Sequence, residues 1–345
     1  MPTPRPMPPA PRRARLPAGD SPVAERIAVP ALFALCLIAL TGCKGGPRSI
    51  EVDDLSEPQL ATESERALAA GEVDRAIESA EALLERTTDG GRRQLALFVA
   101  AEAHRADAAP VKAFRHYQSL LRDFPWSPFV ARCELPVWEL AAAWMAAEPW
   151  FLFGDLFSGR ERGAEAMREF AASFPSSARA DDAVAAIAAY RFERGEYEDA
   201  VVYWDRVVTD YPDSEWADLA AFRRAECWER DARGPAYDAT PLLRAARDYR
   251  RYVALRPDGA RRAEAEARAR AVDEQIAQGE LLRADLYLLR EQTRGARIHL
   301  ANVVLAYPQT AAAAQARTLL ESRGWDVSLH SVDTLRPPPV EGHGR

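Results

Sequence analysis

The sequence predicts an all-α fold in which about five to six helix hairpins stack into a superhelix. Three observations support this prediction: apolar residues recur at helical spacing, glycine and proline interrupt them at regular intervals, and small residues stand where paired helices would cross. A single hairpin cannot bury its own apolar face, so each one needs neighbours stacked against it. The sequence therefore predicts one repeat domain over residues 59–324.

The clearest hairpin covers residues 178–214. Its first helix is expected over residues 180–193, and its second helix ends before Pro212, because proline cannot continue a helix. Counted back from this proline as position 32, the pattern resembles the 34-residue tetratricopeptide repeat, whose signature small, glycine and large positions are occupied by Ala188, Gly195, Ala200 and Trp204. Small residues at the helix crossing let the two backbones approach closely.

Less regular copies of this pattern lie on both sides of the clear hairpin. They begin near Leu60 and continue over 92–127, 129–175, 215–257 and 262–310, and a final helix is expected over 311–323. The first copy is weak, which is typical of a terminal capping repeat. His104 stands where such repeats usually carry tyrosine, and we expect it to pack in that role rather than to act as a ligand.

The third copy contains an aromatic insertion at residues 148–159, which includes Trp150 and Phe153. Ordinary repeat geometry does not need such a segment. It either covers the groove or a repeat interface, which is the simpler interpretation, or forms an exposed apolar loop that grips a partner or touches lipid.

The first 42 residues are expected to be a targeting signal. An arginine-containing leader precedes an apolar run of about 14 residues, which is short for a membrane span of roughly 20. The run ends in Leu40-Thr41-Gly42-Cys43, which resembles the bacterial lipobox. The resemblance implies that Cys43 is lipidated and becomes the first residue of the mature chain; the alternative is an uncleaved anchor or a buried helix. Lys44, rather than aspartate, favours sorting to the outer membrane.

Composition is consistent with an exported body on a lipid tether. Residues 43–58 lack periodicity and are expected to form a flexible tether, and residues 325–345 a disordered tail. The whole chain has a formal net charge of −7; because the first 42 residues carry five arginines and two acidic residues, the remainder carries −10. This charge argues against a nucleic-acid partner. Cys133 and Cys227 are expected to be buried thiols, with a disulfide as the alternative.

The sequence lacks the motifs of common catalytic and cofactor sites. It has no phosphate-binding loop, zinc-ligand spacing, nucleophile elbow or Cys-x-x-Cys pair. We therefore expect no enzyme activity, no cofactor and no metal. An enzyme with its site in the groove is the disfavoured alternative, because the repeats occupy nearly all of the mature chain.

Repeat arrays act by shape, because the first helices of the hairpins line a concave face that can hold a peptide or a helix. Polar and aromatic residues on those first helices are thus candidates for partner binding. Arg191, Arg223 and Trp228 are the residues that we single out on this ground.

The combination of a lipobox with repeats that end in an aromatic-proline pair resembles the BamD family of outer-membrane assembly lipoproteins. These pairs are Phe124-Pro125, Phe174-Pro175, Tyr211-Pro212 and Tyr307-Pro308. The resemblance implies a lipid-anchored scaffold at the outer membrane, facing the periplasm. It would bind the barrel-inserting subunit and other assembly lipoproteins through its C-terminal repeats, and unfolded outer membrane proteins through its N-terminal ones.

One position departs from this resemblance. His299 stands where the family commonly carries an arginine that faces the barrel-inserting subunit. Either the docking contact has been rebuilt around histidine, or the chain is a lipid-anchored adaptor with another partner. Such an adaptor would serve peptidoglycan synthesis, secretion or polysaccharide export.

Overall fold

The computed structural model describes residues 51–147 and 159–326, and all of the regular secondary structure in these two ranges is helical. The elements are, in chain order, η1 (Val52–Asp54), α2 (Glu57–Ala70), α3 (Val73–Arg86), α4 (Gly90–Ala106), α5 (Pro110–Asp123), α6 (Val130–Met145), α7 (Gly159–Ser173), α8 (Ala180–Glu193), α9 (Tyr197–Asp210), α10 (Ala217–Asp231), α11 (Thr240–Leu255), α12 (Arg262–Leu289), α13 (Thr293–Ala306) and α14 (Ala311–Ser322). The signal, the core of the aromatic insertion and most of the predicted tail lie outside the described residues.

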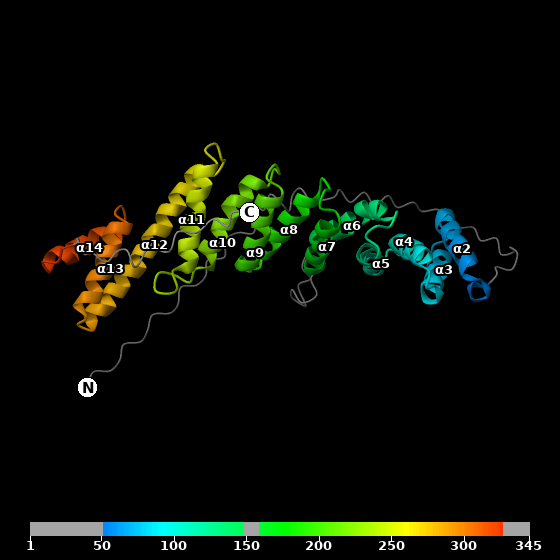
Figure 1. The fold of residues 1–345 in the computed structure, drawn as a ribbon, viewed down its shortest axis with the longest axis horizontal. Helices are drawn as coiled ribbons and strands as arrows, with labels where there is room; N and C mark the ends of the chain where they lie inside the picture. Colours follow the sequence, from blue (N-terminus) through cyan, green and yellow to red (C-terminus); the bar gives the residue numbers. More distant parts are fainter. Residues whose placement is uncertain (1–50, 148–158, 327–345) are drawn as a thin grey trace, which may run out of the picture.

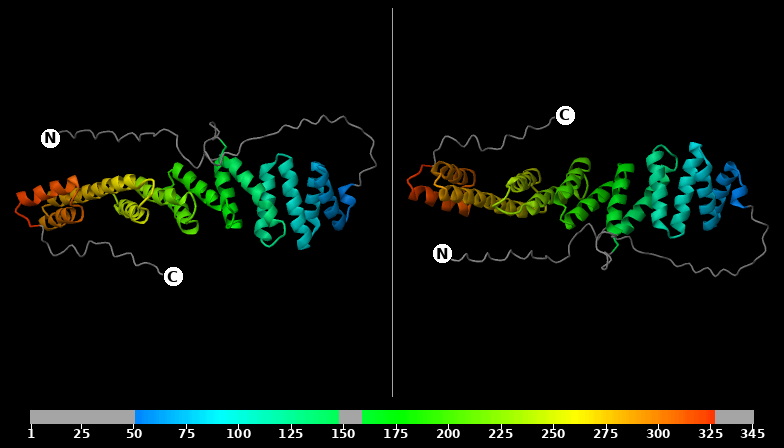
Figure 2. Two further views of the ribbon diagram at one scale, coloured as in Figure 1. Left: turned by 90° about the horizontal axis from the view of Figure 1, so that it is seen from above. Right: turned by 90° about the horizontal axis from the view of Figure 1, so that it is seen from below.

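Consecutive helices pair into six hairpins, from α2 with α3 to α12 with α13, and α14 packs at the end. The hairpins follow one another in a single elongated row, with α2 at one end and α14 at the other (Figure 1). The views from above and below show the same row (Figure 2). The predicted all-α array of about five to six hairpins is therefore confirmed.

The hairpin of α8 and α9 has the predicted construction. Ala188 and Ala200 are fully buried, and Gly195 turns the chain between the helices with a φ of 77°, a left-handed conformation that glycine adopts easily. Trp204 fills the space beside them. Helix α9 ends directly before Tyr211-Pro212, as the stop signal predicts. Local sequence and tertiary packing thus agree over this whole unit.

The folded part begins earlier than the sequence suggests. Residues 51–58, expected to be tether, form η1 and the start of α2, and Val52 and Leu55 are buried against the first hairpin. Arg86 of α3 donates hydrogen bonds to the carbonyl oxygens of Asp53 and Leu55. The sequence did not predict this because the segment is held on the first hairpin by two apolar side chains and the Arg86 hydrogen bonds, and these give no periodic pattern.

The core is a series of clusters rather than one centre. The largest runs from α4 to α10, a second joins α10, α11 and α12, and a third joins α12, α13 and α14. Two smaller clusters lie under the N-terminal hairpins. Each hairpin is therefore stabilised mainly by its immediate neighbours, as in other repeat arrays.

Both cysteines of the described repeats are buried and unpaired, so the expectation of buried thiols is confirmed. Burial raises the pKa of the Cys133 thiol to about 12. It raises the pKa of Cys227 as well. Both residues are accordingly inert core side chains in this fold.

Gly279, in the middle of α12, marks a close backbone approach. A Cβ at this position would overlap the carbonyl oxygen of Pro235 in the loop between α10 and α11. Alanine normally stabilises a helix relative to glycine by about 0.5–1 kcal/mol. We expect Gly279→Ala to do the reverse and to lower the free energy of unfolding by about 1–3 kcal/mol, because the loop must move.

Urea unfolding followed by circular dichroism measures this effect. Gly90→Ala is the matched control, since a Cβ there meets only the Phe124 ring at an ordinary distance of 3.9 Å. The control should be neutral or slightly stabilising. A Gly279→Ala variant that is more stable than wild type by about 0.5–1 kcal/mol would show that the loop yields without cost.

Candidate functional site

Arg191 lies near the end of α8 and is held by acidic residues of its own chain. Its guanidinium donates to Glu161 of α7 at 3.0 Å and to Glu196 at 2.6 Å. The side chain is only partly exposed. A partner that binds at Arg191 must therefore compete with, or join, an existing charge network. Whether it binds a partner stays a prediction.

Arg223 and Trp228 lie on α10, and both are half-buried. The Arg223 guanidinium lies 5.0 Å from the centroid of the Phe192 ring and donates to Glu226 at 2.7 Å. The Trp228 ring is covered by the Arg244 guanidinium at 4.6 Å. The structure thus places these two first-helix residues in cation–aromatic pairs with residues of neighbouring helices.

His299, on α13, faces the neighbouring helix α12. Its Nδ1 donates a hydrogen bond to Glu280 at 2.7 Å, and its ring stacks on Tyr287 with centroids 5.2 Å apart. Burial raises the pKa of Glu280, but the hydrogen bond from His299 and the charge of Arg283 outweigh burial, so the net pKa lies below its ordinary value. His299 is thus held in place by Glu280 and Tyr287 of α12. The sequence alone does not indicate these contacts.

A row of exposed leucines lies on the C-terminal half of α12. Leu282, Leu286 and Leu289 are spaced i, i+4 and i+7 and so share one face of the helix. Leu289 is 83% exposed. We call these three residues the leucine stripe. The leucine stripe was not predicted, because the spacing of the three leucines is visible in the sequence but their exposure is not.

The aromatic insertion cannot be placed in this picture, because Trp150 and Phe153 lie outside the described residues. Another aromatic residue, Trp126, is 95% exposed in the turn after α5. Trp126 was not among the residues predicted from the sequence to bind a partner. A large apolar side chain at such a turn is a candidate contact for a partner or for lipid.

Within the two described ranges, none of the helices combines the length and apolar composition needed to cross a bilayer. The described repeats thus contribute no spanning segment.

Comparison with known proteins gives one family and several solved structures. Residues 160–327 match the model of the YfiO family, described as an outer membrane lipoprotein. No curated protein matches the chain. The matched segment begins in α7 and extends just beyond α14, so it contains Arg191, Arg223, Trp228, His299 and the leucine stripe.

Three solved structures are similar to this chain. A tetratricopeptide repeat protein from Parabacteroides merdae is 14% identical over 77% of this chain and 97% of its own, with a TM-score of 0.30. The TPR domain of P58(IPK) is 14% identical over 77% of this chain and 66% of its own, with a TM-score of 0.26. Pseudomonas aeruginosa pilF is 12% identical over 78% of this chain and 99% of its own, with a TM-score of 0.24.

Proposed function

We propose that this chain is a lipid-anchored periplasmic scaffold of the machinery that assembles outer membrane barrel proteins. The observation that carries the proposal is the match of residues 160–327 to an outer membrane lipoprotein family. That segment forms the C-terminal part of the helical array. The chain would act by binding, not by catalysis.

In this proposal the anchor is Cys43, whose sulfur receives a diacylglyceryl group before the signal is cut off and whose new amino end is then acylated. Several acyl chains hold a protein on a membrane far more stably than one, at about 0.8 kcal/mol per buried methylene. In the sequence, Cys43 precedes η1, the first element of the array, by nine residues. The array would then stand in the periplasm on the inner face of the outer membrane.

The docking surface that we propose for the barrel-inserting subunit is the leucine stripe. An unpartnered apolar helix face at the end of an array is suited to a second folded domain. The stripe lies within the matched segment, close in sequence to Tyr287 and Glu280, which hold His299. Unfolded barrel precursors would bind to the N-terminal hairpins, which lie outside that segment.

The test is crosslinked capture of the tagged full-length protein from separated outer membranes, with identification of captured proteins by mass spectrometry. We expect the barrel-inserting subunit to be recovered with wild type. Leu286→Glu should reduce recovery by about tenfold, since placing a charge in an apolar contact costs at least about 1.4 kcal/mol. Leu255→Glu is the matched control, because Leu255 is an exposed leucine on α11 outside the stripe.

A second arm separates anchoring from docking. Cys43→Ala removes the acylation site and should reduce both the amount of protein in the outer membrane fraction and the capture, while a leucine-stripe variant should stay in the outer membrane fraction. Recovery of wall-synthesis or export components without the barrel-inserting subunit would contradict the proposal and favour another envelope adaptor. Equal recovery with Leu286→Glu and Leu255→Glu would exclude the stripe.

A further inference from the structure

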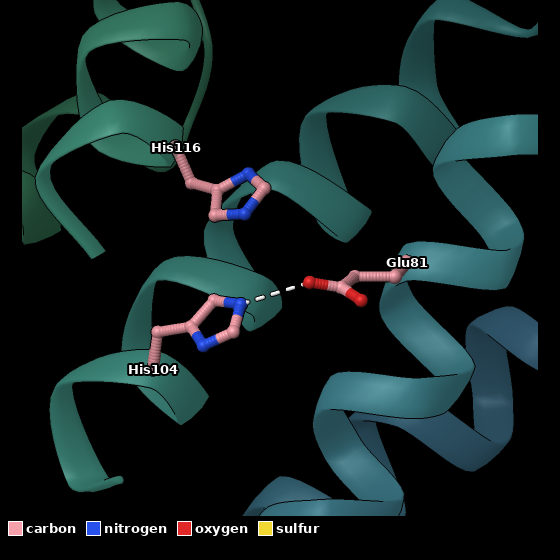
Figure 3. A group of neighbouring side chains, drawn as sticks. All are labelled: Glu81, His104 and His116. Carbon is pink, nitrogen blue, oxygen red and sulfur yellow. Dashed lines mark hydrogen bonds and ion pairs between the residues drawn. The ribbon is translucent and has the colours of Figure 1, made fainter. Parts of the chain in front are cut away.

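Three side chains with metal-binding chemistry meet in the N-terminal hairpins. Glu81 comes from α3, His104 from α4 and His116 from α5, and all three point toward one another (Figure 3). One possible ligand atom of each lies within 4.8 Å of the other two. The sequence separations are 23 and 12 residues, so only the fold brings the three side chains together.

The environment of His104 differs from that of an ordinary surface histidine. The side chain is 1% exposed, and its Nε2 forms a hydrogen bond with Glu81 at 2.9 Å. Its Nδ1 is buried without a hydrogen-bond partner among the described residues. The His116 ring stacks on it, with centroids 5.4 Å apart and planes within 5°. This ring is thus fixed in place by packing.

The second histidine is half-buried beside the first. A neutral imidazole has a lone pair that can bind a metal cation. Glu81 supplies the negative charge that a cation needs, which also offsets the nearby Lys112 and Arg115.

Contrary to the sequence-based expectation that the chain binds no metal and that His104 only packs, we propose that Glu81, His104 and His116 bind one divalent transition-metal cation of the zinc type. Two imidazoles and one carboxylate are a known zinc donor set, and imidazole ligands disfavour magnesium and calcium. Zinc–ligand distances of about 2.0–2.1 Å in a tetrahedral site place the ligand atoms about 3.3–3.4 Å apart. The Glu81 oxygen already lies 2.9 Å from the His104 Nε2, so the site needs only small rotations of the exposed Glu81 and the half-buried His116 around the fixed His104.

The proposed cation would connect α3, α4 and α5, and hence the first hairpin to the second. The first hairpin has a neighbour on one side only, and its clusters are small. A metal at this point would stabilise the end of the array, since a ligand that binds only the folded state raises its stability. The site lies outside residues 160–327 and is independent of the proposed docking function.

Calorimetric titration of Zn²⁺ into the chelator-treated full chain, purified without a histidine tag, tests the proposal. We expect one tight site per chain in wild type. His116→Gln and Glu81→Gln should each weaken it by at least about tenfold, because each removes one of three ligands. Both residues are accessible enough for these variants to fold. His104→Gln is less suitable, because His104 is buried.

His299→Gln is the matched control. His299 has the same kind of contact with a glutamate, but no second histidine takes part in that pair. Zinc affinity should be unchanged in this variant. His330 and His343, present in every protein compared, set the background. Equal zinc affinity in wild type, His116→Gln and Glu81→Gln would overturn the proposal, as would the absence of a tight site in wild type.

Cobalt gives an independent readout. Co²⁺ in a four-coordinate site absorbs visible light strongly, whereas six-coordinate Co²⁺ absorbs weakly. We expect the strong spectrum in wild type and in His299→Gln, and its loss in His116→Gln. Zinc should also raise the midpoint of thermal unfolding in wild type but not in His116→Gln. A weak spectrum in wild type, or an equal rise in both proteins, would count against the site.

Discussion

Replacing Trp204 by alanine is expected to lower the free energy of unfolding by about 3–5 kcal/mol, the cost of truncating a large buried aromatic side chain. Trp204 is almost fully buried in the cluster that runs from α4 to α10. The cavity would lie between α9 and its neighbours, in the middle of the array. Neighbouring hairpins can close it only by shifting whole helices.

The phenylalanine variant separates volume from polarity at the same site. The Trp204 Nε1 has no hydrogen-bond partner among the described residues, so it is a buried donor left unsatisfied. Trp204→Phe removes this donor as well as some volume, and we expect a loss of only about 1–2 kcal/mol. Urea unfolding of both variants measures the difference. Val202→Ala, at an exposed position of the same helix, should change stability by less than about 0.5 kcal/mol. Similar losses for alanine and phenylalanine would contradict this account.

Asp248→Ala is expected to cost about 3 kcal/mol, because it leaves a buried guanidinium short of a partner. Asp248 is 2% exposed and accepts from Arg224 at 3.1 Å and from Arg247 at 3.0 Å. Breaking a buried ion pair typically costs 3–5 kcal/mol. The expected value is at the lower end, since Arg224 keeps its second partner, Asp205 of α9.

A surface pair supplies the control for Asp248. Asp210 accepts from Arg206 at 3.1 Å on the exposed face of α9. Asp210→Ala should cost less than about 1 kcal/mol, because water replaces the lost partner. Thermal unfolding of the two variants at neutral pH compares them directly. If Asp248→Ala were no worse than Asp210→Ala, the network between α9, α10 and α11 would contribute little to stability.

The hairpins were predictable because each is specified locally. A small residue at each crossing, a glycine at the turn and a proline after the second helix are all read within one repeat, as Ala188, Gly195 and Pro212 show. The start of the fold was not predictable, since Val52 and Leu55 are held by contacts with the first hairpin and do not form part of a periodic pattern. Local patterns thus predict the helices, but not the packing between them.

Candidate binding residues were less predictable, because their state depends on partners from other helices. The sequence placed Arg191 and His299 on helices but gave no sign of Glu161 or Glu280 beside them. The meeting of His104 with His116 and Glu81 depends likewise on how three helices pack. Residue spacing in the sequence therefore predicts the helices, but which charged side chains face each other depends on how the helices pack.

Helix α12 gives the C-terminal end of the array a particular stiffness. Its 28 residues correspond to a rod of about 42 Å, and it takes part in two successive clusters, one with α11 and one with α13 and α14. A turn at residues 256–261 still separates the last two hairpins, but the single helix α12 packs in the clusters on both sides of it. A partner docked on the leucine stripe would therefore contact the same uninterrupted helix whose N-terminal part packs against α11.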